Sequence, residues 1–272
     1  MDTFERQGLR FDVRDGGPRD GAVVVLLHGF PQDASSWREV EPVLHEAGLR
    51  TLAPDQRGYS PAASPSGTEA YTITELVDDV VALMDEAGAD QVALVGHDWG
   101  GAVAWAAATL HPQRVATLTV LSTPHPAALR RANRRPSQWL RGWYRTFFQL
   151  PRIPERLLAG RVGAMMQRDQ VPGAEAYGRR FASPESLHGP ITWYRANRGL
   201  GADVMDQPVR VPTTYVWGSH DTALRRRAAE LTREYVAAEY RFVELDADHW
   251  LPDKEPSRVA AEIISRSTEH PV

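Results

Sequence analysis

Residues 92–101 read Val-Ala-Leu-Val-Gly-His-Asp-Trp-Gly-Gly, and an alanine-rich stretch follows them at 102–110. The initial run is short and apolar on both faces, which is typical of a buried strand in a parallel sheet. The stretch after it predicts a helix, because alanine has the highest helix propensity. Gly96 and Gly100 flank Asp98 in the Gly-x-nucleophile-x-Gly pattern of a sharp turn that holds a strained residue at the top of a sheet. We therefore expect Asp98 to be a nucleophile; the alternative is that it only caps the helix.

Similar buried-strand patterns occur before and after this turn, and helical patterns lie between them. The apolar strand patterns are at 22–27, 50–53, 91–95, 115–121, 213–217 and 240–245, and an alternating one is at 9–14. The clearest helical pattern runs from Ile73 to Ala87, with a capping-box pair of Thr72 and Glu75 at its start and Gly88 at its end. Strands that alternate with helices predict an α/β fold with a mostly parallel sheet covered on both faces.

The alternation of strands and helices stops between 127 and 206. This segment is rich in arginine, tryptophan and proline, and its amphipathic stretches predict helices without a convincing strand. Strand-like sequence resumes at Val211. We therefore predict one α/β core made of 1–126 and 207–272, with a helical insertion at 127–206.

Composition and charge restrict the partners. The chain has 272 residues, of which 42% are hydrophobic and 24% charged, as in an ordinary soluble globular protein. A net charge of -4 gives no long-range attraction to nucleic acid or an anionic membrane, so neither is expected as a partner. The arginine clusters at 130–135 and 225–227 are the alternative, as a binding patch, but Lys254 is the only lysine and arginine serves as the general surface cation.

Cysteine and long apolar segments are both missing from the sequence. With no cysteine, disulfides, thiolate metal sites and a cysteine nucleophile are excluded. The longest aliphatic run, 22–27, is too short to span a bilayer, and residues 1–14 lack the apolar region of a signal peptide. We therefore expect a cytoplasmic protein.

An acid and a histidine each follow a later strand pattern. Asp221 comes after one strand pattern and His249 after the next. With Asp98 they give the order nucleophile, acid, histidine that is found in α/β hydrolases. Because a histidine oriented by an acid can act as a general base, we expect this pair to activate water. Asp246 and Asp248 are close enough to His249 in the sequence to be alternative acids.

The loop His28-Gly29-Phe30-Pro31 follows another buried strand pattern. A loop in this place can aim a backbone N–H group at a developing oxyanion, and the residue after the nucleophile can supply a second one. Phe30 and Trp99 are therefore the candidate donors of an oxyanion hole.

The sequence resembles the epoxide hydrolases of the α/β-hydrolase superfamily over nearly the whole chain. The matching motifs are His28-Gly29-Phe30-Pro31, Asp55-Gln56-Arg57-Gly58-Tyr59, Gly96-His97-Asp98-Trp99-Gly100-Gly101, Thr123-Pro124-His125-Pro126, and the loops of Asp221 and His249. One departure is Ser60, where many relatives have glycine after the tyrosine. We expect this difference to affect the shape of the loop and not the chemistry.

The resemblance also implies that the insertion 127–206 is a helical cap supplying two tyrosines. The stretches 143–149 and 191–197 look similar to the family's tyrosine motifs, which implies Tyr144 and Tyr194. By themselves these tyrosines would be interpreted as packing aromatics. Tyr177 is the alternative for either place.

Epoxide hydrolysis to a vicinal diol is the activity that the resemblance implies, and the residue types suit it. A carboxylate such as Asp98 can displace the ring oxygen and become an ester. Tyr144 and Tyr194 would protonate the leaving oxygen, because a phenol with a pKa of about 10 stays protonated at neutral pH. His249, oriented by Asp221, would then activate the water that hydrolyses the ester.

The partners expected are therefore a small epoxide and water. No metal or organic cofactor is expected, because the sequence has none of the metal or dinucleotide motifs. The chain is expected to be a monomer or a homodimer.

Several alternatives use the same fold. A haloalkane dehalogenase would share Asp98, but Phe30 stands where such enzymes often carry a side-chain amide for the halide. A fluoroacetate-type dehalogenase usually has arginine in place of Trp99, and an esterase is disfavoured by the missing serine. A non-catalytic ligand-binding protein on a hydrolase scaffold would have no need of Asp98, Asp221 and His249 together.

Overall fold

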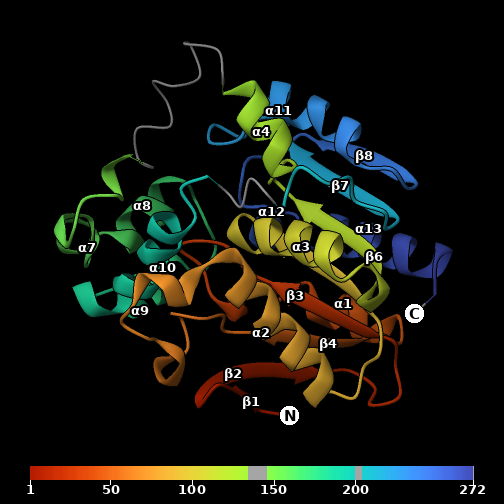
Figure 1. Cartoon of the computed structure of the whole chain (residues 1–272), viewed down its shortest axis with the longest axis horizontal. Coiled ribbons are helices and arrows are strands. Elements are labelled where there is room, and N and C mark those ends of the chain that lie inside the picture. The colour runs from red at the N-terminus through yellow and green to blue at the C-terminus, as the bar shows by residue number, and fades with distance from the viewer. Residues whose placement is uncertain (134–145, 200–203, 272) are drawn as a thin grey trace.

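The centre of the computed structural model, which describes residues 1–133, 146–199 and 204–271, is one sheet of eight strands (Figure 1). The strand order is β1-β2-β4-β3-β5-β6-β7-β8. The strands are β1 Thr3–Arg6, β2 Leu9–Gly16, β3 Val23–Leu27, β4 Arg50–Pro54, β5 Val92–His97, β6 Val115–Leu121, β7 Thr213–Gly218 and β8 Tyr240–Leu245. β2 is antiparallel to β1 and β4, and all the remaining neighbours are parallel.

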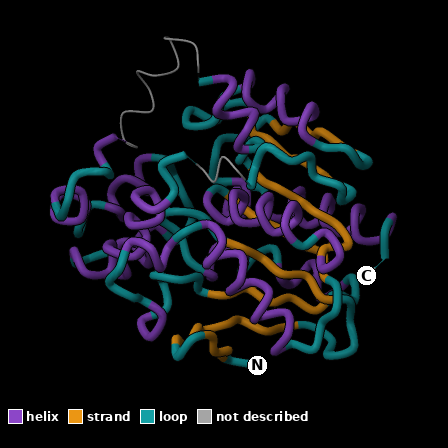
Figure 2. The backbone as a smooth tube through the Cα atoms, viewed as in Figure 1, coloured by secondary structure: helices purple, strands orange, loops and turns teal. Residues whose placement is uncertain are grey.

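Helices lie on both faces of this sheet (Figure 2). The α-helices are α1 Glu41–Glu46, α2 Ile73–Glu86, α3 Trp99–Leu110, α4 Pro126–Ala132, α7 Ile153–Leu158, α8 Val162–Arg168, α9 Ala174–Arg180, α10 Pro184–Ala196, α11 Arg226–Leu231, α12 Leu251–Lys254 and α13 Pro256–Glu269. Short 3-10 helices are η1 Ala34–Trp37, η2 Pro61–Ala63, η3 Thr68–Tyr71, η4 Pro112–Arg114 and η5 Thr232–Tyr235. No helix of the described residues has the length and apolar character that a membrane crossing requires.

The buried strands divide their side chains between two apolar layers. Along β3, Val25 and Leu27 face the layer that contains α2 and α3, whereas Val24 and Leu26 face the layer that contains α13. This division follows from the two-residue period of a strand, and it explains why these strands are apolar throughout. The mostly parallel, two-sided α/β fold predicted from the sequence is confirmed.

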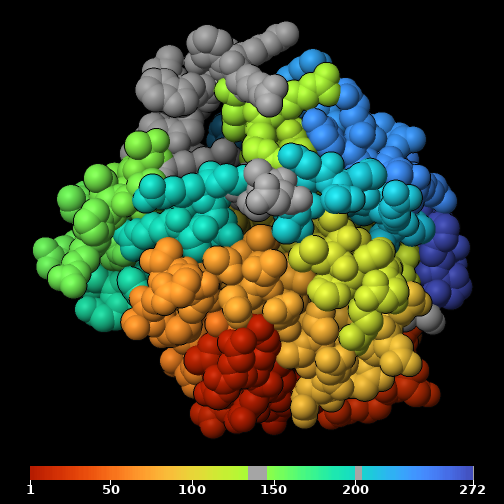
Figure 3. Space-filling model, viewed as in Figure 1, coloured from red at the N-terminus to blue at the C-terminus, as the bar shows by residue number. Residues whose placement is uncertain are grey.

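The described part of the chain between β6 and β7 is helical. Helices α7 to α10, green to teal in Figures 1 and 3, gather beside the core. α10 lies close to the loop after β4, where a Cβ added to Gly189 would come within 2.4 Å of the Cα of Gly58. The indole N–H of Trp193 donates to the carbonyl of Arg57 at 2.9 Å. By contrast, α4 packs with α11 in a separate apolar cluster.

The strand patterns agree with the structure to within two residues, but two local features differ. β1 was not expected as a separate strand, because the turn at Gln7 and Gly8 has weak sequence signals. The predicted capping box is wrong: Thr72 makes no side-chain cap bond to α2. Instead the Asn197 side chain accepts from the N–H of Ile73 at 2.7 Å. A tertiary contact has replaced the local cap.

Candidate active site

Asp98 stands at the turn between β5 and α3. Its backbone has φ 49° and ψ -117°, a conformation that a residue with a side chain rarely adopts. The turn is tight, because a Cβ on Gly96 would lie 2.3 Å from the carbonyl oxygen of Gly100. The Asp98 side chain makes no capping bond to α3, so the alternative of a simple helix cap is wrong.

His249 lies between two carboxylates. Its Nε2 is 3.4 Å from Oδ2 of Asp98, and its Nδ1 is 2.7 Å from Oδ2 of Asp221. The other oxygen of Asp221 accepts from the N–H groups of Ala223 and Leu224, each at 2.8 Å. Asp221 is therefore held on both oxygens, and it can orient the imidazole ring with Nε2 toward Asp98.

The two alternative acids point elsewhere. Asp246 is exposed and bonds His220, while Asp248 bonds Lys254 and the backbone N–H of Trp250. The structure thus brings Asp221 to His249. Asp246 and Asp248, which are close to His249 in the sequence, do not contact its ring through their carboxylates.

The charges of the site favour an ionised Asp98. Burial opposes ionisation of Asp98, but the hydrogen bond and charge of His249, with the N–H of Phe30, lower the pKa of Asp98 to about 2. Burial likewise opposes a charged imidazole, yet Asp221 and Asp98 together raise the pKa of His249 well above its ordinary value. Asp98 is therefore an anion at neutral pH, beside a histidine that holds its proton.

The loop after β3 brings a hydrogen-bond donor to Asp98. The backbone N–H of Phe30 donates to Oδ1 of Asp98 at 3.0 Å. Gly29 allows this approach, since a Cβ there would lie 2.4 Å from the Cβ of Asp98. Trp99 is the first residue of α3, where helix N–H groups have no partner within the helix. The N–H of Phe30 thus adjoins the carboxylate, and that of Trp99 lies in the next residue of the chain at the start of the helix.

A cavity of about 270 Å³ opens above Asp98. Its described lining is mostly apolar, with Trp99, Leu129 and Leu224 among the wall residues, and Arg198 is a charged exception. Tyr194 of α10 lies on the same cavity, and its ring is 4.9 Å from that of Trp99. A cavity of this kind suits a small, largely apolar molecule placed against a carboxylate.

The three tyrosines considered from the sequence have different places. Tyr194 shares the cavity with Asp98, whereas Tyr144 lies outside the described residues. Tyr177 is fully buried, and its hydroxyl donates to Asp253 at 3.1 Å. Tyr177 does not line the described cavity, so it is no substitute for Tyr194 there.

Several lining residues were not singled out in the sequence. Thr146 and Gln149 line the cavity within the stretch 143–149, and Asn197 within 191–197. Their membership of the two tyrosine motifs was the available signal. The sequence contains no such signal for Leu129 and Leu224, because only folding brings α4 and the loop after β7 together.

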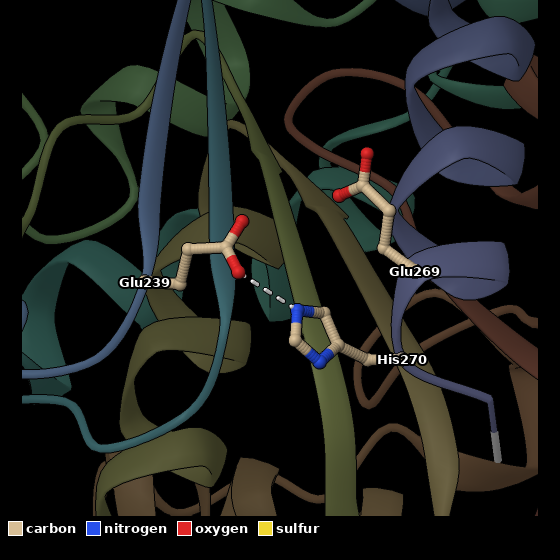
Figure 4. A group of neighbouring side chains, drawn as sticks. All are labelled: Glu239, Glu269 and His270. Atoms are coloured by element: carbon tan, nitrogen blue, oxygen red, sulfur yellow. Dashed lines mark hydrogen bonds and ion pairs between the residues drawn. The ribbon is translucent and has the colours of Figure 1, made fainter.

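One acidic group in the described residues has the spacing of a metal site, formed by Glu239, Glu269 and His270 (Figure 4). Arg266 binds Glu239 at 2.7 Å, and Arg241 binds Glu269. Since the arginines already neutralise these exposed carboxylates, the group has the character of a surface ion-pair network.

Comparisons with known proteins identify the family of this chain. A family model described as alpha/beta hydrolase fold matches residues 22–256. Epoxide hydrolase A of Mycobacterium tuberculosis (strain ATCC 25618 / H37Rv) is 34% identical, covering 96% of this chain and 94% of its own. Epoxide hydrolase 4 of Homo sapiens is 33% identical, covering 93% and 74%. The crystal structure of Epoxide Hydrolase A from Mycobacterium thermoresistibile has a TM-score of 0.84 at 30% identity, covering 97% and 96%.

Proposed function

Because this chain belongs to the α/β-hydrolase fold family and is an epoxide hydrolase, we propose that it makes a vicinal diol in two steps, through an ester on Asp98. The observation that carries the proposal is the position of the Asp98 carboxylate, which lines the cavity at a strained turn with Nε2 of His249 at 3.4 Å. An aspartate in this place can attack carbon directly, which a capping residue has no need to do.

In the first step, an oxygen of Asp98 forms a bond to an epoxide carbon, and the carbon–oxygen bond of the ring breaks. The released oxygen is a strongly basic alkoxide, which takes a proton from a phenol. Tyr194 supplies that proton from the cavity wall, with Tyr144 as the second donor implied by the family. The result is a hydroxyalkyl ester of Asp98 and a tyrosinate.

Ester formation also changes the proton affinity of His249. Asp98 and Asp221 both raise the pKa of this histidine, and the ester carries no charge. Once Asp98 is esterified, the imidazole releases its proton more readily, and the tyrosinate takes up one proton in exchange, so that the phenol is restored. The neutral ring is then ready to act as a base.

In the second step, His249 takes a proton from water, and the hydroxide attacks the ester carbonyl of Asp98. The N–H groups of Phe30 and Trp99 stabilise the oxyanion of the tetrahedral intermediate. Collapse of the intermediate releases the diol and restores the carboxylate, with the proton retained on His249. The leaving oxygen takes its proton from the added hydroxyl group. The diol therefore carries away one oxygen of Asp98, and the oxygen of water replaces it in the carboxylate.

We also propose that the insertion 127–206 acts as the substrate-binding cap of the core formed by 1–126 and 207–272. Thr146 and Tyr194 of the insertion line the cavity together with Asp98 and Leu224 of the core. A substrate is therefore enclosed between residues from both parts of the chain. This arrangement explains how the cap residues can select a substrate without taking part in nucleophilic attack.

A product assay with two substrates tests the reaction type. Styrene oxide should yield the corresponding diol, whereas 1-bromobutane should release no bromide. Bromide release without diol would favour a dehalogenase with the same nucleophile. The absence of both products would favour a ligand-binding protein.

A further inference from the structure

The end of β6 contacts the backbones of both the nucleophile and the base. Oγ1 of Thr123 donates to the carbonyl oxygen of Asp98 at 2.7 Å. Oγ of Ser122 donates to the carbonyl oxygen of His249 at 2.8 Å. Two consecutive hydroxyl groups thus reach two loops that are far apart in the sequence.

Ser122 and Thr123 are themselves firmly held. The N–H of Ser122 donates to the carbonyl of Val216 at 2.8 Å, and its own carbonyl accepts from the hydroxyl of Tyr215 at 2.8 Å. The carbonyl of Thr123 accepts from the indole N–H of Trp105 at 3.0 Å. Ser122 is fully buried, and Thr123 is largely buried at the wall of the cavity, so both hydroxyls are held in a fixed position.

The backbone of Ser122 has φ 65°, in the left-handed region that non-glycine residues seldom occupy. Such a conformation persists only where the surrounding contacts enforce it. Here the contacts with β7 enforce the turn that brings the two hydroxyls to the two loops.

The carbonyl of His249 has a second donor. Nε2 of His97 lies 2.8 Å from it, and since a carbonyl only accepts, that nitrogen carries hydrogen. His97 is completely buried, and burial with the nearby His249 lowers the pKa of His97 to about 4, so its ring is neutral. The main chain of His249 is thus held from both β5 and β6.

We propose that Ser122 and Thr123 are positioning residues, which set the spacing of Asp98 and His249 through these two backbone carbonyls. The inference rests on the proposed covalent mechanism. Within it, the two hydroxyls serve different steps: Thr123 holds the residue that forms the ester, and Ser122 holds the residue needed only to hydrolyse it. Thr123 lines the cavity, but its hydroxyl donates to the carbonyl of Asp98, as that of Ser122 does to the carbonyl of His249.

Rapid-quench kinetics with intact-protein mass spectrometry test this division. Ser122→Ala should form the ester with styrene oxide at the parent rate but hydrolyse it about three- to tenfold more slowly, the effect of one hydrogen bond. The esterified fraction at steady state should therefore rise. Thr123→Val should form the ester about three- to tenfold more slowly, without a rise in the esterified fraction.

Matched variants separate positioning from folding. Thr123→Ser keeps the hydroxyl and should restore the rate of ester formation, while Thr117→Val, at a buried threonine of the same strand, should change neither step. Ser122→Gly also lacks the hydroxyl but adopts φ 65° without strain, so it replaces Ser122→Ala if the alanine variant fails to fold.

The outcomes distinguish this inference from the mechanism on which it rests. Equal effects of Ser122→Ala and Thr123→Val on both steps, or no effect on either, would overturn the positioning roles. If no ester forms even in His249→Gln, the covalent mechanism itself is contradicted, and the division of roles is contradicted with it.

Discussion

The hydroxyl of Tyr177 donates to the carboxyl group of Asp253 at 3.1 Å, and this contact joins α9 of the helical insertion to α12, just after the loop of His249. Gln32 donates to the second oxygen of the same group. Burial nevertheless raises the pKa of Asp253 to about 7, outweighing these donors. The insertion is thus attached to the core through a carboxyl group that is protonated at mildly acidic pH.

The Asp253 contact predicts a pH dependence of stability. In the unfolded chain an aspartate titrates near pH ~4, so between about pH 4 and pH 7 the folded protein holds a proton that the unfolded chain has lost. Its contribution to the free energy of unfolding is full below about pH 4 and falls as the pH rises to about 7.

Asp253→Asn should remove this part of the pH dependence, because an amide stays neutral. The amide oxygen of the new side chain can still accept from Tyr177, and Gln32 can turn its own amide so that Oε1, which has no partner in the described residues, accepts from the new N–H group. The melting temperature of the variant minus that of the parent should be higher at pH 8 than at pH 5. A parallel pair of profiles would contradict the assignment.

Asp98→Ala should abolish turnover while leaving the fold intact. The side chain faces the cavity and makes no capping bond, so its removal leaves the helix start unaltered. Alanine retains a Cβ, so the backbone strain remains and no large gain in stability is expected. Diol formation and the melting temperature check this together. Activity above a few per cent of the parent would exclude Asp98 as the nucleophile.

Tyr194→Phe should slow ester formation by about 10-fold or more, and the double change with Tyr144→Phe by roughly 10² to 10⁴, the usual contribution of a positioned general acid. Single-turnover kinetics with styrene oxide measure the step. Tyr177→Phe is the control: it removes the bond to Asp253 and should lower stability without a comparable loss of rate. Parent-rate opening by the double variant would show that the acid lies elsewhere.

Asn197→Ala should be strongly destabilising, by roughly 2–4 kcal/mol. This buried side chain accepts from the N–H of Ile73 and donates to the carbonyls of Tyr71 and Trp193. Its loss removes the bonds to Ile73 and Tyr71, while the carbonyl of Trp193 still accepts from the backbone N–H of residue 197 at 3.1 Å. Thr72→Ala should cost under about 0.5 kcal/mol, because Thr72 makes no capping bond. Urea denaturation measures the free energy of unfolding of both variants. A larger loss for Thr72→Ala than for Asn197→Ala would show that Thr72 caps the helix after all.

The contrast between Thr72 and Asn197 illustrates what the sequence can predict. Strands, helices and the turn at Asp98 follow from local patterns, since apolar periodicity and paired glycines act over a few residues. The cap of α2 comes from α10, far away in the chain, and no local pattern encodes it. Likewise, Asp221 and His249 were indicated by order and loop position, but Ser122 has no chemical signature until folding places it beside His249.

The measurement that bears most directly on the mechanism is the mass of His249→Gln after mixing with styrene oxide. Ring opening needs only Asp98 and the acids, whereas ester hydrolysis needs a base, so the ester should accumulate. We predict a burst in which about one equivalent of epoxide is consumed, a protein heavier by one substrate mass, and that mass on the peptide containing Asp98. An unmodified Asp98 in a variant that demonstrably binds the epoxide would contradict it, even if diol were still formed slowly.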